Sequence, residues 1–197
     1  MTRPAPAAAT LALLLGAALA GCPLPQVLPE YPTTGAITPP RIVADSATPL
    51  DTVLLVDPAC AAAPSYLLSA SLVDENAIEN VEVRWFVDYL PGDQQREVPR
   101  RPIEFIPPVD ALTTLRTVTP WTFRPYDFDP GATEADRLAF RQGGGLHVVE
   151  LVVSNGFQPD AGAGARPYRA TEAGFETQVQ RWVFHYAPGG ACGFPAP

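Results

Sequence analysis

The sequence predicts an all-β fold, a two-sheet antiparallel β-sandwich of about seven strands. Short segments in which apolar and polar residues alternate recur along the chain, as half-buried strands require. Breaks rich in Pro and Gly separate these segments, as expected for strands joined by turns. With 47% hydrophobic and 17% charged residues, the 197-residue chain is too apolar to be disordered and can build one core.

The clearest strand is predicted over Val81–Tyr89, where Trp85 and Val87 fall on one face and Phe86 falls on the other. Phe86 is therefore expected to point away from the core and to offer an exposed apolar contact to a partner. Six further segments are predicted as strands: Thr52–Val56, Tyr66–Val73, Val98–Ile106, Leu115–Phe123, Leu146–Asn155 and Gln178–Tyr186.

One short helix is predicted at Thr133–Phe140. Thr133 has the side chain of an N-cap residue, and Asp136 follows three positions later, as the start of a helix prefers. The run Gly143-Gly144-Gly145 comes next, but a strand and not a helix follows it, which argues against a phosphate-binding loop.

The first 21 residues are predicted to be a signal peptide. A positively charged start, Met1-Thr2-Arg3, precedes an apolar stretch that is densest from Leu11 to Ala20. This stretch is shorter than the roughly 20 residues that a membrane-spanning helix needs, and it fits the apolar region of a signal peptide.

The end of this leader, Leu19-Ala20-Gly21-Cys22, resembles the lipobox of bacterial lipoproteins. The resemblance implies cleavage before Cys22 and a diacylglycerol on its thiol, which would anchor the chain to a membrane of the bacterial cell envelope, at the outer membrane or a periplasmic face. Buried acyl chains contribute about 0.8 kcal/mol per CH₂, so two or three chains anchor stably. The alternative is an ordinary secreted protein in which Cys22 is fortuitous.

Residues 22–50 are predicted to form a Pro-rich tether, and residues 51–197 the folded domain. Seven prolines occur in this stretch, and proline lacks a backbone donor, so the tether is expected to be extended and to join no sheet.

Two segments of the folded domain resemble bacterial Ig-like domains, including the PKD and cadherin-like groups. Gly145–Phe157 is similar to their penultimate strand and turn, and Val83–Asp88 to their third strand. The resemblance implies that Trp85 packs against the opposite sheet. The chain lacks the W-x-F-G-D-G turn of the PKD pattern.

Cys60 and Cys192 remain after Cys22 is assigned to the lipid. An even number of cysteines in an exported domain predicts a disulfide, which would pin the C-terminal tail to one end of the sandwich. The alternative is a pair of free thiols.

His147 and His185 are the only histidines in the chain. Their strands would place them side by side if a turn were centred near residue 166, and the two rings would then be close enough to share a zinc ion. The alternative is packing of two partly buried neutral imidazoles without a metal. Either arrangement depends on the register, because a slip of one residue places the two rings on opposite faces of the sheet.

Acidic loops are candidates for calcium. Asp127 and Asp129 occur in one loop and Asp74-Glu75-Asn76 in another, and cadherin-like domains bind calcium with such loops. The alternative is that these side chains cap their own turns.

The sequence indicates a binding protein and not an enzyme. It contains no G-x-S-x-G motif and no lysine, and no cofactor is expected. The net charge of −8 argues against nucleic acid as a partner. The expected function is that of a lipid-anchored envelope lipoprotein whose Ig-like domain binds another envelope protein or a surface polymer. The alternative is a calcium- or zinc-binding adhesion module, or a metal-dependent enzyme of the envelope.

Overall fold

The computed structural model describes residues 38–76, 78–108, 114–159 and 168–193. The chain divides into two units, Met1–Ala36 and Ile37–Pro197, and the described residues all belong to the second. The predicted signal peptide, Cys22 and the first part of the predicted tether lie outside the described residues. Within the described part, no helix has the length and apolar character needed to cross a membrane.

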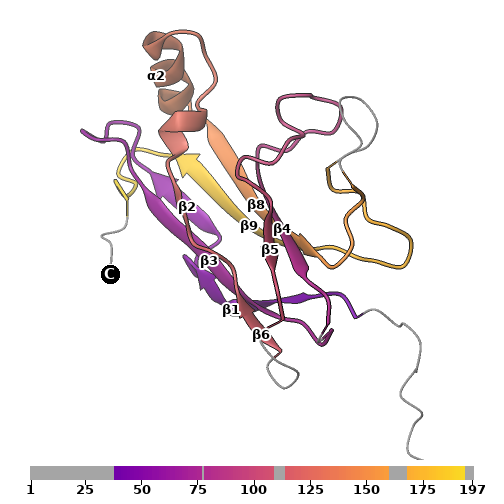
Figure 1. Ribbon diagram of the computed structural model, residues 1–197. Helices are drawn as coiled ribbons and strands as arrows, with labels where there is room; N and C mark the ends of the chain where they lie inside the picture. Colours follow the sequence, from indigo (N-terminus) through magenta and orange to yellow (C-terminus); the bar gives the residue numbers. More distant parts are fainter. Residues whose placement is uncertain (1–37, 77, 109–113, 160–167, 194–197) are drawn as a thin grey trace, which may run out of the picture. The chain divides into compact units, whose positions relative to one another are not determined.

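The described residues form two β-sheets, which confirms the predicted all-β sandwich (Figure 1). They contain nine strands, one α-helix and one 3-10 helix. The elements are β1 (Arg41–Thr48), β2 (Val53–Val56), β3 (Tyr66–Val73), β4 (Val81–Val87), β5 (Glu104–Ile106), β6 (Leu115–Thr117), β7 (Trp121–Phe123), η1 (Pro125–Phe128), α2 (Glu134–Gln142), β8 (Leu146–Ser154) and β9 (Gln178–Tyr186).

The first sheet is antiparallel and has β3 at its centre. Its order is β1-β3-β6, and β7 pairs with β3 beyond β6. The single strand predicted over Leu115–Phe123 is split into β6 and β7, and Pro120 lies in the interruption, where it offers no backbone donor.

The second sheet has the order β2-β9-β8-β4-β5. Its pairs are antiparallel except β2–β9, which is parallel. The strand predicted over Val98–Ile106 is shortened to β5, because Pro99 and Pro102 precede it.

Strand β1 corrects the predicted tether. Residues 41–48 were expected to join no sheet, yet they pair with β3, and Ile42 lies opposite Leu72. The prolines of this region lie at 40 and 49, so the eight residues between them keep every backbone donor. Ala47 is buried in the core, and the folded domain therefore begins at β1.

Three tryptophans lie in the core between the sheets. Trp85 of β4 is buried and contacts Trp121 of the opposite sheet edge-on at 5.3 Å between ring centroids. It also stacks on Trp182 of β9 at 5.9 Å. The expected packing of Trp85 against the opposite sheet is confirmed, and large aromatic side chains of this kind dominate the energetics of a core.

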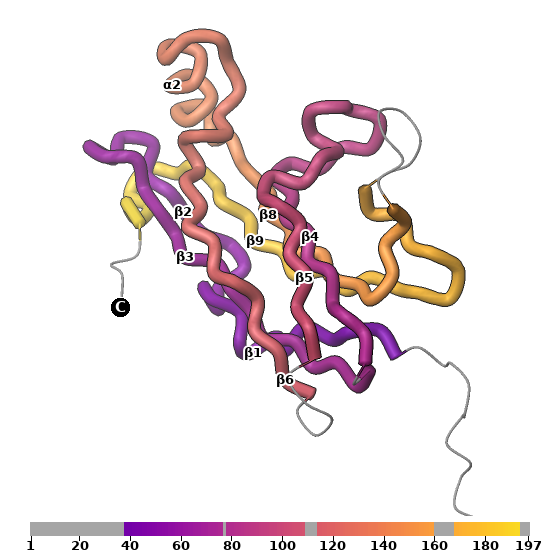
Figure 2. Tube along the Cα trace, viewed as in Figure 1, coloured from indigo at the N-terminus to yellow at the C-terminus, as the bar shows by residue number. Residues whose placement is uncertain are grey.

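The outer face of β4 does not present Phe86 to solvent, so the predicted contact residue is wrong. Phe86 is 0% exposed and packs with Val152 and Phe157 in a second, smaller apolar cluster. Tyr168 and Arg169 lie against this cluster, the Arg169 guanidinium 4.7 Å from the Phe86 ring centroid. Phe157, Tyr168 and Arg169, which belong to the described parts of the connection between β8 and β9 (orange to gold in Figure 2), thus cover this residue.

Helix α2 begins where the sequence predicts. Thr133 is the N-cap, its hydroxyl accepts from the Asp136 backbone N–H, and the Asp136 carboxylate accepts from the Thr133 backbone in return. The ring of Phe140 contacts His147 of β8 and Tyr186 of β9, which places α2 at the end of the sandwich where β8 begins and β9 ends (Figure 1).

The predicted disulfide between Cys60 and Cys192 is present, with the two Cα atoms 5.5 Å apart. Beside it, the backbone N–H of Ala191 donates to the carbonyl of Leu55 at 2.9 Å. The disulfide and this hydrogen bond hold the C-terminal segment against the free edge of β2.

Candidate functional site

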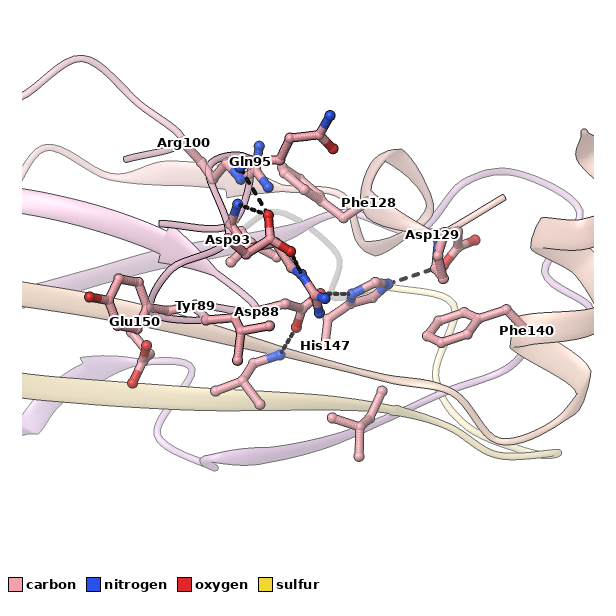
Figure 3. Close-up of a pocket in the computed structure, with 16 residues that line it drawn as sticks. Asp88, Tyr89, Asp93, Gln95, Arg100, Phe128, Asp129, Phe140, His147 and Glu150 are labelled. Atoms are coloured by element: carbon pink, nitrogen blue, oxygen red, sulfur yellow. Dashed lines mark hydrogen bonds and ion pairs between the residues drawn. The ribbon is translucent and has the colours of Figure 1, made fainter. Parts of the chain in front are cut away.

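A pocket of about 800 Å³ lies at the end of the sandwich that carries α2 (Figure 3). Its walls come from the end of β4 and the loop after it, from η1 and α2, and from the start of β8. Aromatic rings and polar side chains share these walls: Tyr89, Phe128, Phe140, Asp88, Asp93, Gln95, Arg96, Arg100, Asp129, His147 and Glu150.

The central polar group is the imidazole of His147, which is 0% exposed. Its Nδ1 lies 2.6 Å from Asp88 Oδ2, and its Nε2 lies 3.1 Å from Asp129 Oδ1 (Figure 3). An ionised carboxylate only accepts hydrogen bonds, so both ring nitrogens donate when the imidazole is protonated. The geometry therefore suits a charged imidazolium held between two carboxylates.

Asp88 reaches this position through an unusual backbone. It follows the last residue of β4 with a φ of 51°, in the left-handed region that Asp tolerates better than most residues. Its backbone N–H donates to the Val148 carbonyl at 2.8 Å, and its Oδ1 accepts from the Val148 N–H at 2.7 Å. One carboxylate oxygen thus accepts the backbone hydrogen bond that a strand carbonyl would otherwise accept, and the other oxygen contacts His147.

Asp129 follows η1 and links four elements of the fold. Besides His147 of β8, its Oδ1 accepts from the Tyr186 hydroxyl of β9 at 2.7 Å. Its Oδ2 lies 3.3 Å from Nε of Arg141 in α2, whose guanidinium also pairs with Glu134. Burial first, and then Asp129, raise the pKa of Tyr186, so this hydroxyl stays a donor. We refer to Asp88, His147, Asp129, Tyr186 and Arg141 as the His147 network.

The network sets the charge of His147. Burial by itself pulls the pKa of the imidazole down, but the hydrogen bonds and charges of Asp129 and Asp88 outweigh it, and the pKa is raised above its ordinary value of 6.5. A histidine whose pKa is higher in the folded than in the unfolded state stabilises the fold fully below the unfolded value. That stabilisation is lost as the pH rises through the folded pKa.

We expect the free energy of unfolding to fall as the pH rises from 6.5 through the folded pKa of His147. Two-dimensional NMR of the histidine rings measures this pKa directly, because His185 gives the one other signal and His185→Gln assigns it. In Asp88→Asn, which removes one carboxylate, the pKa of His147 should move down and the pH dependence should flatten. A pKa of His147 at or below 6.5 in the unaltered protein would contradict this account of the network.

The predicted meeting of the two histidines is wrong. In the β8–β9 register, His147 lies opposite Phe184 and His185 lies opposite Leu146. This differs by one residue from the register that would pair them, and such a slip turns the two side chains to opposite faces of the sheet. His147 instead meets Asp88 and Asp129, which come from other parts of the chain.

Two of the calcium candidates, Asp129 and Asp74, bind other side chains of the protein. Asp127 is exposed, whereas Asp129 is buried in the His147 network. Asp74 pairs with Arg116 at 2.6 Å, and Arg116 donates to the carbonyls of Asn76, Glu79 and Ile106 at 2.8 Å each. A guanidinium thus occupies the oxygen-rich loop. No group of three or more His, Cys, Asp or Glu that could hold a metal ion occurs in the described part of the chain.

The sequence reasoning did not identify Asp88, Arg116 or Arg141. One signal was available for Arg116, because it alternates with Leu115 and Thr117 and shares the inward face of its segment with Val118. For Asp88 and Arg141 we find no local signal, since their partners lie far away in the sequence.

Fold and site together define a disulfide-bridged all-β sandwich with a buried charge network beside a pocket. Comparisons with protein-family models, with curated proteins and with solved structures find no match for this chain.

Proposed function

We propose that the protein is a lipid-anchored, non-catalytic binding module of the bacterial cell envelope. The observation that carries the proposal is the pocket beside His147, whose two ring nitrogens both bind carboxylates of the protein. A general base needs a free nitrogen within hydrogen-bond reach of the proton that it takes. This imidazole therefore has a structural role in the wall of the pocket, and we infer that the pocket binds a ligand without catalysing a reaction.

The cysteines support the export of the domain. Of three cysteines, Cys60 and Cys192 form the disulfide. Structural disulfides are typical of proteins outside the reducing cytosol. Cys22 is then left for the lipid that the sequence Leu19-Ala20-Gly21-Cys22 implies.

The expected partner is another envelope protein or a surface polymer. A membrane-anchored domain meets such partners at high local concentration, because the anchor confines both to the same surface. The pocket offers aromatic and charged side chains together, which suits recognition of a specific polar ligand.

The anchor is tested with the full chain expressed in a bacterial host supplied with an alkyne analogue of palmitate. We expect the protein to take up the label and to partition into detergent, and Cys22→Ser to lose both properties. Intact mass spectrometry of the mature protein should give an acylated cysteine at its N-terminus.

The matched control is the double variant Cys60→Ser/Cys192→Ser, which removes the other two thiols and should keep the label. A mature protein that begins at another residue and carries no acyl chain would refute the anchor and leave a secreted protein.

A further inference from the structure

The charges of the pocket are compensated within the protein except at one residue. Its carboxylates have protein partners: Asp88 contacts His147, Asp93 contacts Arg96 at 2.9 Å, and Glu150 contacts Arg181 at 2.7 Å. Glu150 also pairs with Arg169. No carboxylate of the described residues lies within ion-pair distance of Arg100, which is exposed and lines the same pocket.

Arg100 is held at the edge of the pocket by its backbone. Its N–H donates to the Trp85 carbonyl of β4 at 2.7 Å, so its position is tied to the sheet. Its guanidinium lies 6.0 Å from the ring centroid of Phe128, another lining residue. A guanidinium presents several donors in one plane and binds carboxylates through paired hydrogen bonds. Arg100 is therefore available for an anionic group of a ligand.

The aromatic walls are fixed by contacts with the core. Phe128 stacks on Phe123 at 5.2 Å between ring centroids, and Phe140 meets Tyr186 edge-on at 6.0 Å. Such rings offer rigid apolar faces, against which the C–H face of a flat ligand can pack.

The remaining wall accepts hydrogen bonds. Asp88, Asp93 and Glu150 use some of their oxygen lone pairs on protein donors, but a carboxylate has about four acceptor sites. Gln95 also lines the pocket, and its backbone N–H donates to the Asp93 carboxylate at 2.9 Å (Figure 3). A ligand that fills this pocket should therefore bring several hydroxyl donors, because an apolar ligand would bury these acceptors unpaired.

We propose that the pocket binds a carboxylate-bearing sugar, the acidic residue of a surface polysaccharide. Its carboxylate binds Arg100, its hydroxyls donate to the carboxylates of the wall, and its ring packs against Phe128 and Phe140. The proposal rests on the binding role proposed above and does not depend on the lipid at Cys22. The volume of about 800 Å³ falls within the range of about 300–1,000 Å³ that is usual for ligand pockets.

The test is isothermal titration calorimetry on the full mature chain in detergent. The probes are three acidic oligosaccharides, built from galacturonate, from mannuronate and from the disaccharide of hyaluronan. The comparison ligands are a neutral galactose trisaccharide and phenylacetate. We expect one or more of the acidic oligosaccharides to bind. The neutral sugar should bind at least about tenfold more weakly, because it has no carboxylate for Arg100. Phenylacetate should also bind at least about tenfold more weakly, because it has a carboxylate but no hydroxyl donors for the acceptors of the wall.

Arg100→Gln should weaken binding of the acidic sugar by about tenfold or more, because it removes the charge and keeps a donor. The matched control is Arg124→Gln, an exposed arginine outside the pocket whose side chain makes no hydrogen bond or ion pair with the described residues. It should bind as the unaltered protein does. Circular dichroism confirms that both variants are folded.

Absence of binding by all three acidic oligosaccharides to folded protein overturns the proposal. If the neutral trisaccharide binds as tightly as the acidic sugars, Arg100 does not recognise a carboxylate. If phenylacetate binds as tightly, the pocket does not recognise the hydroxyls of a sugar. An unacylated protein that still binds the acidic sugar refutes the anchor alone, whereas an acylated protein that binds none of them refutes this inference alone.

Discussion

Arg116→Met is expected to lower the free energy of unfolding by about 3–5 kcal/mol, the cost of removing one partner of a buried ion pair. The side chains of Arg116 and Asp74 are 1% and 0% exposed, and they lie 2.6 Å apart. Methionine fills a similar volume but donates no hydrogen bond. Asp74 would then keep a buried charge without its cation, and the three carbonyls that Arg116 serves would lose their donor.

Urea unfolding followed by tryptophan fluorescence measures this loss. The control is Arg41→Met, which breaks the pair with Glu75 beside the same loop. That pair is 61% and 54% exposed, and exposed pairs contribute only about 0–1 kcal/mol. If both substitutions lower the free energy of unfolding by the same small amount, the buried pair of Arg116 and Asp74 does not stabilise the fold more than the exposed pair does.

Removal of the disulfide in Cys60→Ala/Cys192→Ala is expected to cost about 2–5 kcal/mol. The bond joins residues that are 132 positions apart, and a closed loop of that length restricts the unfolded chain strongly. In the folded protein the C-terminal segment would keep its backbone contacts with β2, so the fold should survive with lower stability.

Thermal and urea unfolding of the oxidised protein, the reduced protein and the double variant measure this contribution. The reducing agent should bring the unaltered protein to the stability of the double variant and should not affect the double variant itself. Unchanged stability on reduction would contradict the expected role of the disulfide.

Local pattern was sufficient for most of the strands and for the helix. The boundaries of β3 and β9 agree with the predicted ranges, because alternation of apolar and polar residues is a property of each segment alone. The start of α2 was predictable for the same reason, since Thr133 and Asp136 bind each other across a single turn. The pairing of Cys60 with Cys192 followed from their number.

The candidate site was largely beyond such reasoning. His147 and Asp129 were each singled out, but their contact with each other and with Asp88 was not predicted, because Asp88 is 59 residues and Asp129 18 residues away from His147. A shift of one residue in the β8–β9 register decided that His147 and His185 point to opposite faces. The pocket itself arises where three separate parts of the chain meet.

Residues 41–48 and Phe86 also have surroundings that differ from the predicted ones, again because of contacts between distant parts of the chain. Residues 41–48 looked like part of a tether because prolines surround them, and only pairing with β3 makes them a strand. Phe86 falls on the outer face of β4 as the alternation implies, but Phe157 and Tyr168, from the described parts of the connection between β8 and β9, cover it. Alternation states which residues share a face, whereas long-range packing decides whether that face meets water, another segment of the chain or a ligand.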